Sequence, residues 1–134
     1  MSNIKWVTGL YEAFGRGDIP AVLGAFDPNI SWSEAENNPY QPDGSAWIGP
    51  DAVVQNLFMR LADDWESFTV TPKQFHDAGS TVVVEGRYSG TAKATGKSID
   101  AQFCHVWGVS GEKITSFQQY VDTAQLNDVL GASA

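Results

Sequence analysis

The chain has 134 residues, a formal charge of −8 at pH 7 and 43% hydrophobic residues. This is the size of one folding unit, so we expect a single domain over residues 1–134. Nucleic acid and anionic membranes are disfavoured as partners, because phosphates are bound by clustered Lys and Arg and the sequence has no basic run. The one cysteine, Cys104, excludes an internal disulfide, and the lack of an apolar signal-peptide core or of an apolar window of about 18 residues predicts a cytoplasmic protein.

The N-terminal residues predict two helices. Apolar side chains recur at spacings of three and four at Ile4, Val7, Leu10, Tyr11 and Phe14. This stripe is typical of an amphipathic helix over residues 4–15. Glycines end it, Asp18 is placed to cap a short second helix, and Pro20 stands in the first turn of that helix, where its missing N–H costs nothing.

Residues 29–36 alternate in the manner of a β-strand. Ile30, Trp32 and Glu34 share one face of this strand, so a carboxyl group lies beside two large apolar side chains. Residues 37–50 are rich in turn formers but also contain large aromatic side chains. This mixture indicates a structured loop that could cover a cavity.

A third helix starts at Pro50-Asp51 and continues at helical spacing to Asp63. The remainder predicts four strands, at residues 66–76, 81–90, 98–109 and 113–122, and a short final helix at 123–130. Because the loops between these strands are short, the strands pair antiparallel. Helices that precede such a sheet define the α+β class, and a sheet that curls around its helices leaves a hollow at its open end.

This order of elements, together with several short motifs, resembles a known family. The motifs are GD before a short helix, Trp-Ser-Glu in the first strand, Pro39-Tyr40, TGK at 95–97, and HVW followed by GEKI and QQYVDT. They resemble the SnoaL-like and ketosteroid-isomerase-like branch of the nuclear-transport-factor-2-like superfamily. The resemblance implies a cystatin-like, cone-shaped roll with three N-terminal helices packed in the concave face of a strongly curved, mostly antiparallel sheet. It also implies one deep apolar pocket and, commonly, a homodimer built on the outer sheet face.

The resemblance carries over to individual residues. The spacing from Asp18 to Glu34 matches that between the corresponding aspartate and the general base of ketosteroid isomerases. The position of the family's oxyanion tyrosine falls on Leu10 and that of its protonated acid on Phe103. Since both donors are then missing, true steroid isomerisation is not expected. In the polyketide cyclases an aspartate near the end of the sheet acts, and Asp122 is the corresponding candidate.

Period-two alternation predicts which side chains of the last two strands face the hollow. On the strand at 98–109 these are Ala101, Phe103, His105, Trp107 and Val109. On the strand at 113–122 these are Ile114, Ser116, Gln118, Tyr120 and Asp122. Polar groups among aromatic rings are typical of a pocket for a small hydrophobic or aromatic molecule. The expected pocket wall consists of Trp32, Tyr40, Phe58, Phe103, Trp107 and Gln118.

Four of the polar side chains suit acid–base chemistry. In an apolar pocket the pKa of Glu34 is raised, which suits a base that abstracts a proton beside a carbonyl group. Asp122 is the alternative base. His105 and Tyr120 are placed to donate to the oxygen that gains charge, or to position a substrate.

Each candidate also has a structural interpretation. His105 can be a core imidazole that is hydrogen-bonded to a neighbour. Glu34 can be a strand-end carboxylate that faces water. Asp122 precedes the final helix and can be its N-cap, and Tyr40 is either a packing residue or part of a lid.

Other chemistries lack their motifs. The sequence has no Cys/His spacing for a metal, no phosphate-binding loop in its proper context and no nucleophile elbow, which favours a site without metal or cofactor. The first hypothesis is a cofactor-independent acid–base enzyme, of isomerase, cyclase or hydratase type, that acts on a small hydrophobic carbonyl compound. The alternative is a non-catalytic module that stores or senses a ligand, or that mediates association.

The outer face of the sheet predicts a homodimer, because its apolar surface is larger than a monomer usually exposes. The residues expected on this face are Val82, Val84, Cys104, Val106, Phe117 and Val121. The expected partners are therefore a small hydrophobic ligand and a second copy of the chain.

Overall fold

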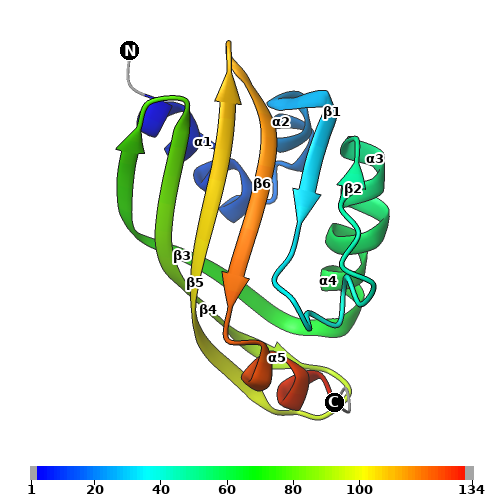
Figure 1. The fold of residues 1–134 in the computed structure, drawn as a ribbon. Helices are drawn as coiled ribbons and strands as arrows, with labels where there is room; N and C mark the ends of the chain where they lie inside the picture. Colours follow the sequence, from blue (N-terminus) through cyan, green and yellow to red (C-terminus); the bar gives the residue numbers. More distant parts are fainter. Residues whose placement is uncertain (1–2, 132–134) are drawn as a thin grey trace.

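The computed structural model describes residues 3–131 and confirms the α+β class (Figure 1). The helices are α1 (Asn3–Gly15), α2 (Ile19–Gly24), α3 (Pro50–Val53), the π-helical turn η1 (Val54–Phe58), α4 (Met59–Asp64) and α5 (Thr123–Leu130). The strands are β1 (Phe26–Ser33), β2 (Trp47–Ile48), β3 (Trp65–Ala78), β4 (Thr81–Ala92), β5 (Ser98–Ser110) and β6 (Lys113–Val121). The predicted order of helices and long strands is confirmed.

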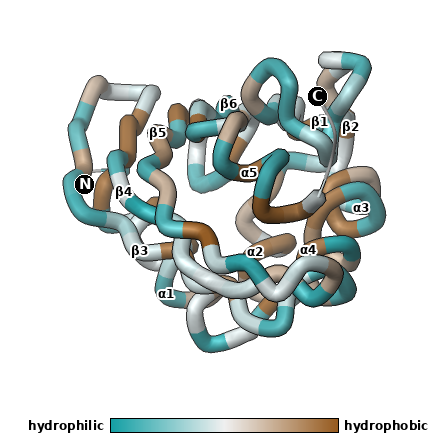
Figure 2. Tube along the Cα trace, turned by 90° about the horizontal axis from the view of Figure 1, so that it is seen from below, coloured by the Kyte–Doolittle hydropathy of each residue, from teal (hydrophilic) through white to brown (hydrophobic). Residues whose placement is uncertain are grey.

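The six strands form one curved mixed sheet in the order β2-β1-β6-β5-β4-β3. β1 pairs with β6 in parallel, and the other neighbouring strands pair antiparallel. Seen from below, α1, α2 and α4 lie on one side of the sheet, and α5 crosses its near end (Figure 2). The helices therefore bury their apolar stripes against the concave face. Within residues 3–131, no helix combines the length and the apolar composition needed to cross a membrane.

Two predicted helix starts are confirmed. The Asp18 carboxylate accepts a hydrogen bond from the backbone N–H of Ala21 at 3.2 Å and so caps α2, with a proline in the first turn. Gly49 precedes α3 with a φ of 90°, a left-handed conformation that favours glycine, and Pro50 is the first helical residue. These short-range signals set where the helices enter the concave face.

The third predicted helix is interrupted by the π-helical turn η1. The N–H of Met59 bonds to the carbonyl oxygen of Val54, five residues earlier. Leu57 and Phe58, at the end of this turn, and Leu61 in α4 all contact the interior cavity that is described below. The wider π-helical turn thus directs the adjacent residues Leu57 and Phe58, and Leu61 about one turn later, toward the interior cavity.

A bulge between β5 and β6 overturns part of the predicted alternation. Gly108 lies opposite Ser116 and Val109 opposite Ile114, so Thr115 is an extra residue on β6. One extra residue reverses the face of every side chain that follows. The prediction for β6 is therefore wrong beyond Ile114.

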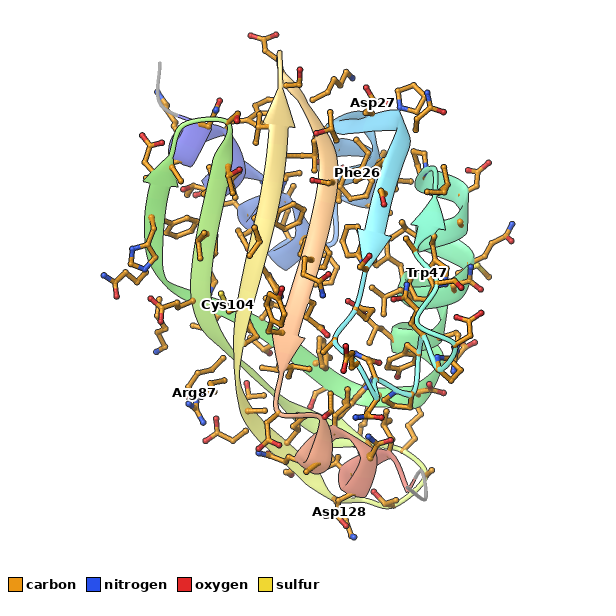
Figure 3. The ribbon with its side chains drawn as sticks, in the orientation of Figure 1. Phe26, Asp27, Trp47, Arg87, Cys104 and Asp128 are labelled. Carbon is orange, nitrogen blue, oxygen red and sulfur yellow. The ribbon has the colours of Figure 1, made fainter. Side chains whose placement is uncertain are left out.

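The expected outer apolar face is also smaller than predicted. Phe117, Val82 and Val84 are buried in the core, with exposures of 4%, 0% and 0%. Val106 and Cys104 remain half-buried on the outer side, and Figure 3 labels Cys104 on β5. Val121 follows the bulge and packs against the core, so four of the six expected interface residues leave the outer face, and the homodimer stays a prediction.

Gly86 provides a test of how the sheet is packed. It lies opposite Phe103 in the β4–β5 ladder, and a Cβ atom there would lie 2.5 Å from the ring Cζ of Phe103 and would overlap the carbonyl oxygen of Thr71. We predict that Gly86→Ala lowers the free energy of unfolding, measured with urea, by about 1–3 kcal/mol. Gly9→Ala, in α1 with nothing within 4 Å of the new Cβ, is the control and should raise it by about 0.5–1 kcal/mol. Equal stability of Gly86→Ala and the wild type would contradict this packing.

Candidate functional site

A cavity of about 90 Å³ lies between the concave face of the sheet and the helices. The phenylalanine and tryptophan rings that line it are Phe14, Phe26, Trp32, Phe58, Trp65, Phe68, Trp107 and Phe117. The polar groups that reach it are Tyr11, Glu34, Asn38, Tyr40, Tyr88, His105 and Gln119. In the described part of the chain, none of the lining residues is a lysine or an arginine. The cavity is therefore an aromatic enclosure with a single carboxyl group.

Six predicted site or pocket residues are brought together at this cavity: Trp32, Glu34, Tyr40, Phe58, His105 and Trp107. β1 directs Trp32 inward, and Glu34 follows immediately after the end of that strand, with only 6% of its surface exposed. The alternation predicted for β5 is confirmed, since His105 and Trp107 both point to the interior. These residues therefore share one cavity.

Tyr120 and Asp122 do not reach the cavity. Because of the bulge at Thr115, Tyr120 lies on the outer face and is 55% exposed. Asp122 accepts a hydrogen bond from the N–H of Gln125 at 3.1 Å and is the N-cap of α5, which is its structural interpretation. The predicted orientation of both side chains toward a shared site is therefore wrong.

Two predicted wall residues also lie elsewhere. Gln118 is half-buried, and its amide donates to the carbonyl oxygen of Gln119 at 2.8 Å. Phe103 is buried but does not line the cavity; its ring stacks on the imidazole of His105 with a centroid distance of 3.9 Å. Phe103 therefore supports the site from behind, and Gln119 takes the inward place that was predicted for Gln118.

A buried hydrogen-bond network holds the imidazole of His105. Nδ1 lies 2.6 Å from the hydroxyl of Tyr11, and Nε2 lies 2.5 Å from the hydroxyl of Tyr88. The indole N–H of Trp107 donates to the Tyr11 oxygen at 2.9 Å, and the amide of Gln119 donates to the Tyr88 oxygen at 2.9 Å. Residues from α1, β4, β5 and β6 thus converge on one ring.

The protonation state of His105 determines how many hydroxyl donors of this network remain without a partner inside it. Burial lowers the pKa of His105 to about 3, so the imidazole is neutral at pH 7 and has one N–H and one acceptor nitrogen. One tyrosine hydroxyl donates to the acceptor nitrogen, and the other accepts from the ring N–H. The O–H of that second tyrosine has no partner within the network and is available to a molecule in the cavity.

Tyr88 is the better placed of the two hydroxyls to supply this donor to chemistry at Glu34. Burial, and next the nearby charge of Glu34, hold the pKa of Tyr88 well above its usual range. The phenol therefore keeps its proton, and it lies close to the carboxyl group. Burial likewise raises the pKa of Tyr11.

Sequence reasoning missed both tyrosines. Tyr11 belongs to the apolar stripe of the first helix, and Tyr88 continues the inward alternation of Val82 and Val84 on β4. In each case the signal that could have identified the tyrosine was a residue with a hydroxyl group at an inward position of an otherwise apolar pattern. The family's donor position was expected at Leu10, and the structure places the hydroxyl group of the next residue, Tyr11, at the cavity together with Leu10.

Glu34 is the acid of the cavity, and its side chain is incompletely paired. Its backbone N–H donates to the amide oxygen of Gln41 at 2.9 Å, which fixes the backbone just past β1. Glu34 Oε2 and the indole Nε1 of Trp32 are buried and make no hydrogen bond to any residue in 3–131. Burial raises the pKa of Glu34 to about 8, although the neighbouring Trp32 indole N–H partly offsets the rise.

Two residues of the loop after Glu34, Asn38 and Tyr40, line the cavity, whereas Trp47, the other aromatic residue of the predicted loop, does not. The hydroxyl of Tyr40 donates to the Asp64 carboxylate at 2.9 Å and accepts from the indole N–H of Trp65 at 3.0 Å. The guanidinium of Arg60 lies 4.6 Å from the centre of the Tyr40 ring. Since Tyr40 lines the cavity on one side and a surface groove on the other, its side chain separates the two.

The opposite pKa shifts of Glu34 and His105 predict how stability depends on pH. The pKa of Glu34 rises from 4.5 to about 8, so the folded state holds more protons between these values and stability falls as pH rises. The pKa of His105 falls from 6.5 to about 3, so stability rises with pH in that window. The two slopes oppose each other between pH 4.5 and 6.5, and only the Glu34 slope remains between pH 6.5 and about 8.

We therefore predict that Glu34→Gln gains stability relative to the wild type by about 1 kcal/mol per pH unit between pH 4.5 and about 8, because the His105 slope is common to both proteins, and gains no more at higher pH. Urea unfolding between about pH 5 and pH 9 measures this difference. Glu36→Gln, which changes an exposed carboxylate two residues away, is the matched control and should run parallel to the wild type. Parallel curves for Glu34→Gln and the wild type would show that the Glu34 pKa is not raised.

The chain was compared with known proteins. No curated protein matches it. Among solved structures, NTF2-like proteins from Burkholderia thailandensis (35% identity, TM-score 0.90) and Burkholderia pseudomallei (29%, 0.87) each align over 97% of this chain and 98% of their own. IdmH, a proposed polyketide cyclase from Streptomyces antibioticus, is 18% identical with a TM-score of 0.80 over 98% of this chain and 99% of its own. A SnoaL-like domain model matches residues 7–117, and the chain therefore belongs to the SnoaL-like family and has the NTF2-like fold that the sequence motifs predicted.

Proposed function

We propose that the protein is a cofactor-independent acid–base enzyme that acts on a small hydrophobic carbonyl compound, with Glu34 as the group that takes up and returns a proton. The observation that carries this proposal is a buried carboxyl group that faces an aromatic cavity without a salt-bridge partner among the described residues. Its pKa of about 8 leaves roughly one tenth of the molecules with a carboxylate at pH 7, and makes that carboxylate a stronger base than an exposed one.

The spare hydroxyl of the His105 network supplies the second half of this chemistry. The carbonyl oxygen of the substrate accepts a hydrogen bond from the Tyr88 O–H, with the His105 Nε2–H directed at the Tyr88 oxygen. Glu34 removes the proton from the carbon beside the carbonyl, and the negative charge moves to the oxygen that Tyr88 holds. Glu34 then returns the proton to a different carbon, which isomerises the substrate. Alternatively, the enolate carbon attacks a second carbonyl group and closes a ring, and Glu34 returns the proton to the alkoxide oxygen that this attack forms.

One structural neighbour, IdmH, is named for a reaction of this class, and no neighbour reported above identifies a substrate. IdmH is a proposed polyketide cyclase, and ring closure through an enolate uses the same proton abstraction. At 18% identity that likeness concerns the fold. The proposal therefore depends on the residues in this cavity.

A non-catalytic ligand-binding module is the second candidate. One observation favours it: both ring nitrogens of His105 are occupied by tyrosine hydroxyls, which is the pattern of a structural core histidine. In that case the cavity holds a molecule without turning it over. The two candidates differ in the effect of removing the Glu34 charge.

We predict that Glu34→Gln lowers the rate of deuterium incorporation beside the carbonyl of cyclohex-3-en-1-one in D₂O by about 100-fold or more, because the amide cannot accept the proton. Mass spectrometry of the recovered ketone measures this rate. Glu36→Gln is the control and should exchange at the wild-type rate. If the wild type accelerates exchange no more than Glu34→Gln does, the protein is not an acid–base enzyme and the binding module remains.

We predict that Tyr88→Phe lowers the same exchange rate by about 100-fold, because the enolate oxygen loses its donor. The matched control is Tyr120→Phe, which removes an exposed hydroxyl on the outer face. Far-ultraviolet circular dichroism of both variants checks that the fold is kept. An unchanged rate in Tyr88→Phe would assign the donor to Tyr11 or remove it from the mechanism, and Tyr11→Phe decides between these outcomes.

A further inference from the structure

Two unpaired polar atoms identify the kind of ligand that the cavity takes. The indole N–H of Trp32 is a donor only, and Glu34 Oε2 belongs to a carboxyl group that is an acceptor when ionised and a donor when protonated. Both residues line the same cavity, and the indole N–H stabilises the ionised carboxyl group enough to offset part of the rise in its pKa, so the two groups lie close together although neither buried atom completes a hydrogen bond within residues 3–131. An unpaired buried polar group is costly, so a ligand that pairs both atoms at once removes two such costs.

A single uncharged oxygen atom satisfies both groups. A hydroxyl or enol oxygen accepts from the Trp32 N–H and donates to the Glu34 carboxylate. An ammonium ion has no lone pair for the indole N–H and would leave Trp32 unpaired, and a carboxylate ligand would meet no lysine or arginine among the lining residues described.

The Trp32 ring is held rigidly, so the direction of its N–H is set before a ligand enters. It stacks on Phe117 with a centroid distance of 3.9 Å and contacts Phe26, Phe58 and Trp107 at 5.6, 6.0 and 5.9 Å. A donor fixed in this way binds an acceptor without losing side-chain freedom on binding. The same rings provide flat apolar walls beside the oxygen site.

The volume of the cavity limits the rest of the ligand. At about 90 Å³ it is smaller than an engineered protein cavity of about 150 Å³ that binds benzene. One ring of five or six atoms is therefore the upper limit for this space, and two fused rings exceed it. Tyr40 is held over this space by Asp64 and Trp65, which keeps the limit in place.

We propose that Trp32 and Glu34 together bind one hydroxyl oxygen of an uncharged, single-ring compound, for which phenol is the simplest model. This names the ligand class of the site proposed above, and so it rests on that assignment of the cavity. It adds a residue, Trp32, as a binding group that selects for oxygen. It also excludes fused polycyclic molecules.

Calorimetric titration of the full chain with four probes tests this proposal without relying on turnover. The probes are phenol, toluene, 2-naphthol and benzylammonium. We expect phenol to bind about tenfold more tightly than toluene, which has the same ring without the oxygen, and 2-naphthol to bind at least tenfold more weakly than phenol. Trp32→Phe should remove the preference for phenol over toluene and leave toluene binding unchanged, and Trp6→Phe, on the outside of α1, should keep it.

Glu34→Gln separates this inference from the proposed function. The amide still offers an acceptor and a donor, so phenol binding should survive in this variant even though the exchange reaction is lost. Equal binding of phenol and toluene, or a preference that persists in Trp32→Phe, overturns the oxygen site. Tight binding of 2-naphthol overturns the size limit, tighter binding of benzylammonium replaces the oxygen site with a cation site, and no binding of any probe removes the ligand site altogether.

A spectroscopic measurement keeps the test decisive if Trp32→Phe fails to fold. In the ¹⁵N-labelled wild type, the indole N–H resonance of Trp32 should move downfield when phenol is added, because it gains an acceptor. Toluene should not produce this shift. A Trp32 resonance that responds equally to both probes contradicts the proposal.

Discussion

A neutral imidazole between two phenol groups is the interaction on which the site depends. Burial keeps His105 uncharged, and a neutral imidazole can only donate once and accept once. This restriction fixes the orientation of Tyr11 and Tyr88, whose oxygens are in turn held by Trp107 and Gln119. Because these five residues come from α1 and from three strands, the same network that positions a hydroxyl donor also ties the first helix to the sheet.

Much of the fold could be predicted from the sequence, because the signals involved span only a few residues. The cap at Asp18, the proline in the first turn of α2 and the alternation that turns His105 inward each depend on near neighbours in the chain. The α+β class follows from the order in which such elements occur. The end of β1 was displaced by three residues, yet Glu34 kept its inward direction.

The parts of the site that could not be predicted depend on residues distant in sequence. The extra residue Thr115 is visible only when β6 is paired with β5, and it exchanges Gln118 and Tyr120 for Phe117 and Gln119 at the cavity. Tyr11 and His105 are 94 positions apart, and no local pattern links them. Pairing across strands and between a helix and a sheet decides which polar groups meet.

Glu34 and Trp32 represent a different kind of departure from the rules of a stable core. Elsewhere in the cavity the polar groups form hydrogen bonds, as buried groups generally do. Leaving a carboxyl group and an indole unpaired costs about 1–3 kcal/mol for each group. Proteins are expected to keep such costly unpaired groups mainly at the places where they bind or act on another molecule, while the rest of the interior is well paired.

The π-helical turn η1 has a consequence for how related proteins diverge. Its hydrogen bond joins residues five apart, whereas an α-helical hydrogen bond joins residues four apart, so the turn holds one extra residue. Deleting a single residue there would restore a regular helix and rotate Leu57 or Phe58 by about 100° around its axis, away from the cavity. Loss or gain of one residue in η1 would therefore change the shape of the cavity while the sheet and the polar residues keep their places. Related proteins could in this way acquire new ligands through a change in the length of η1 alone.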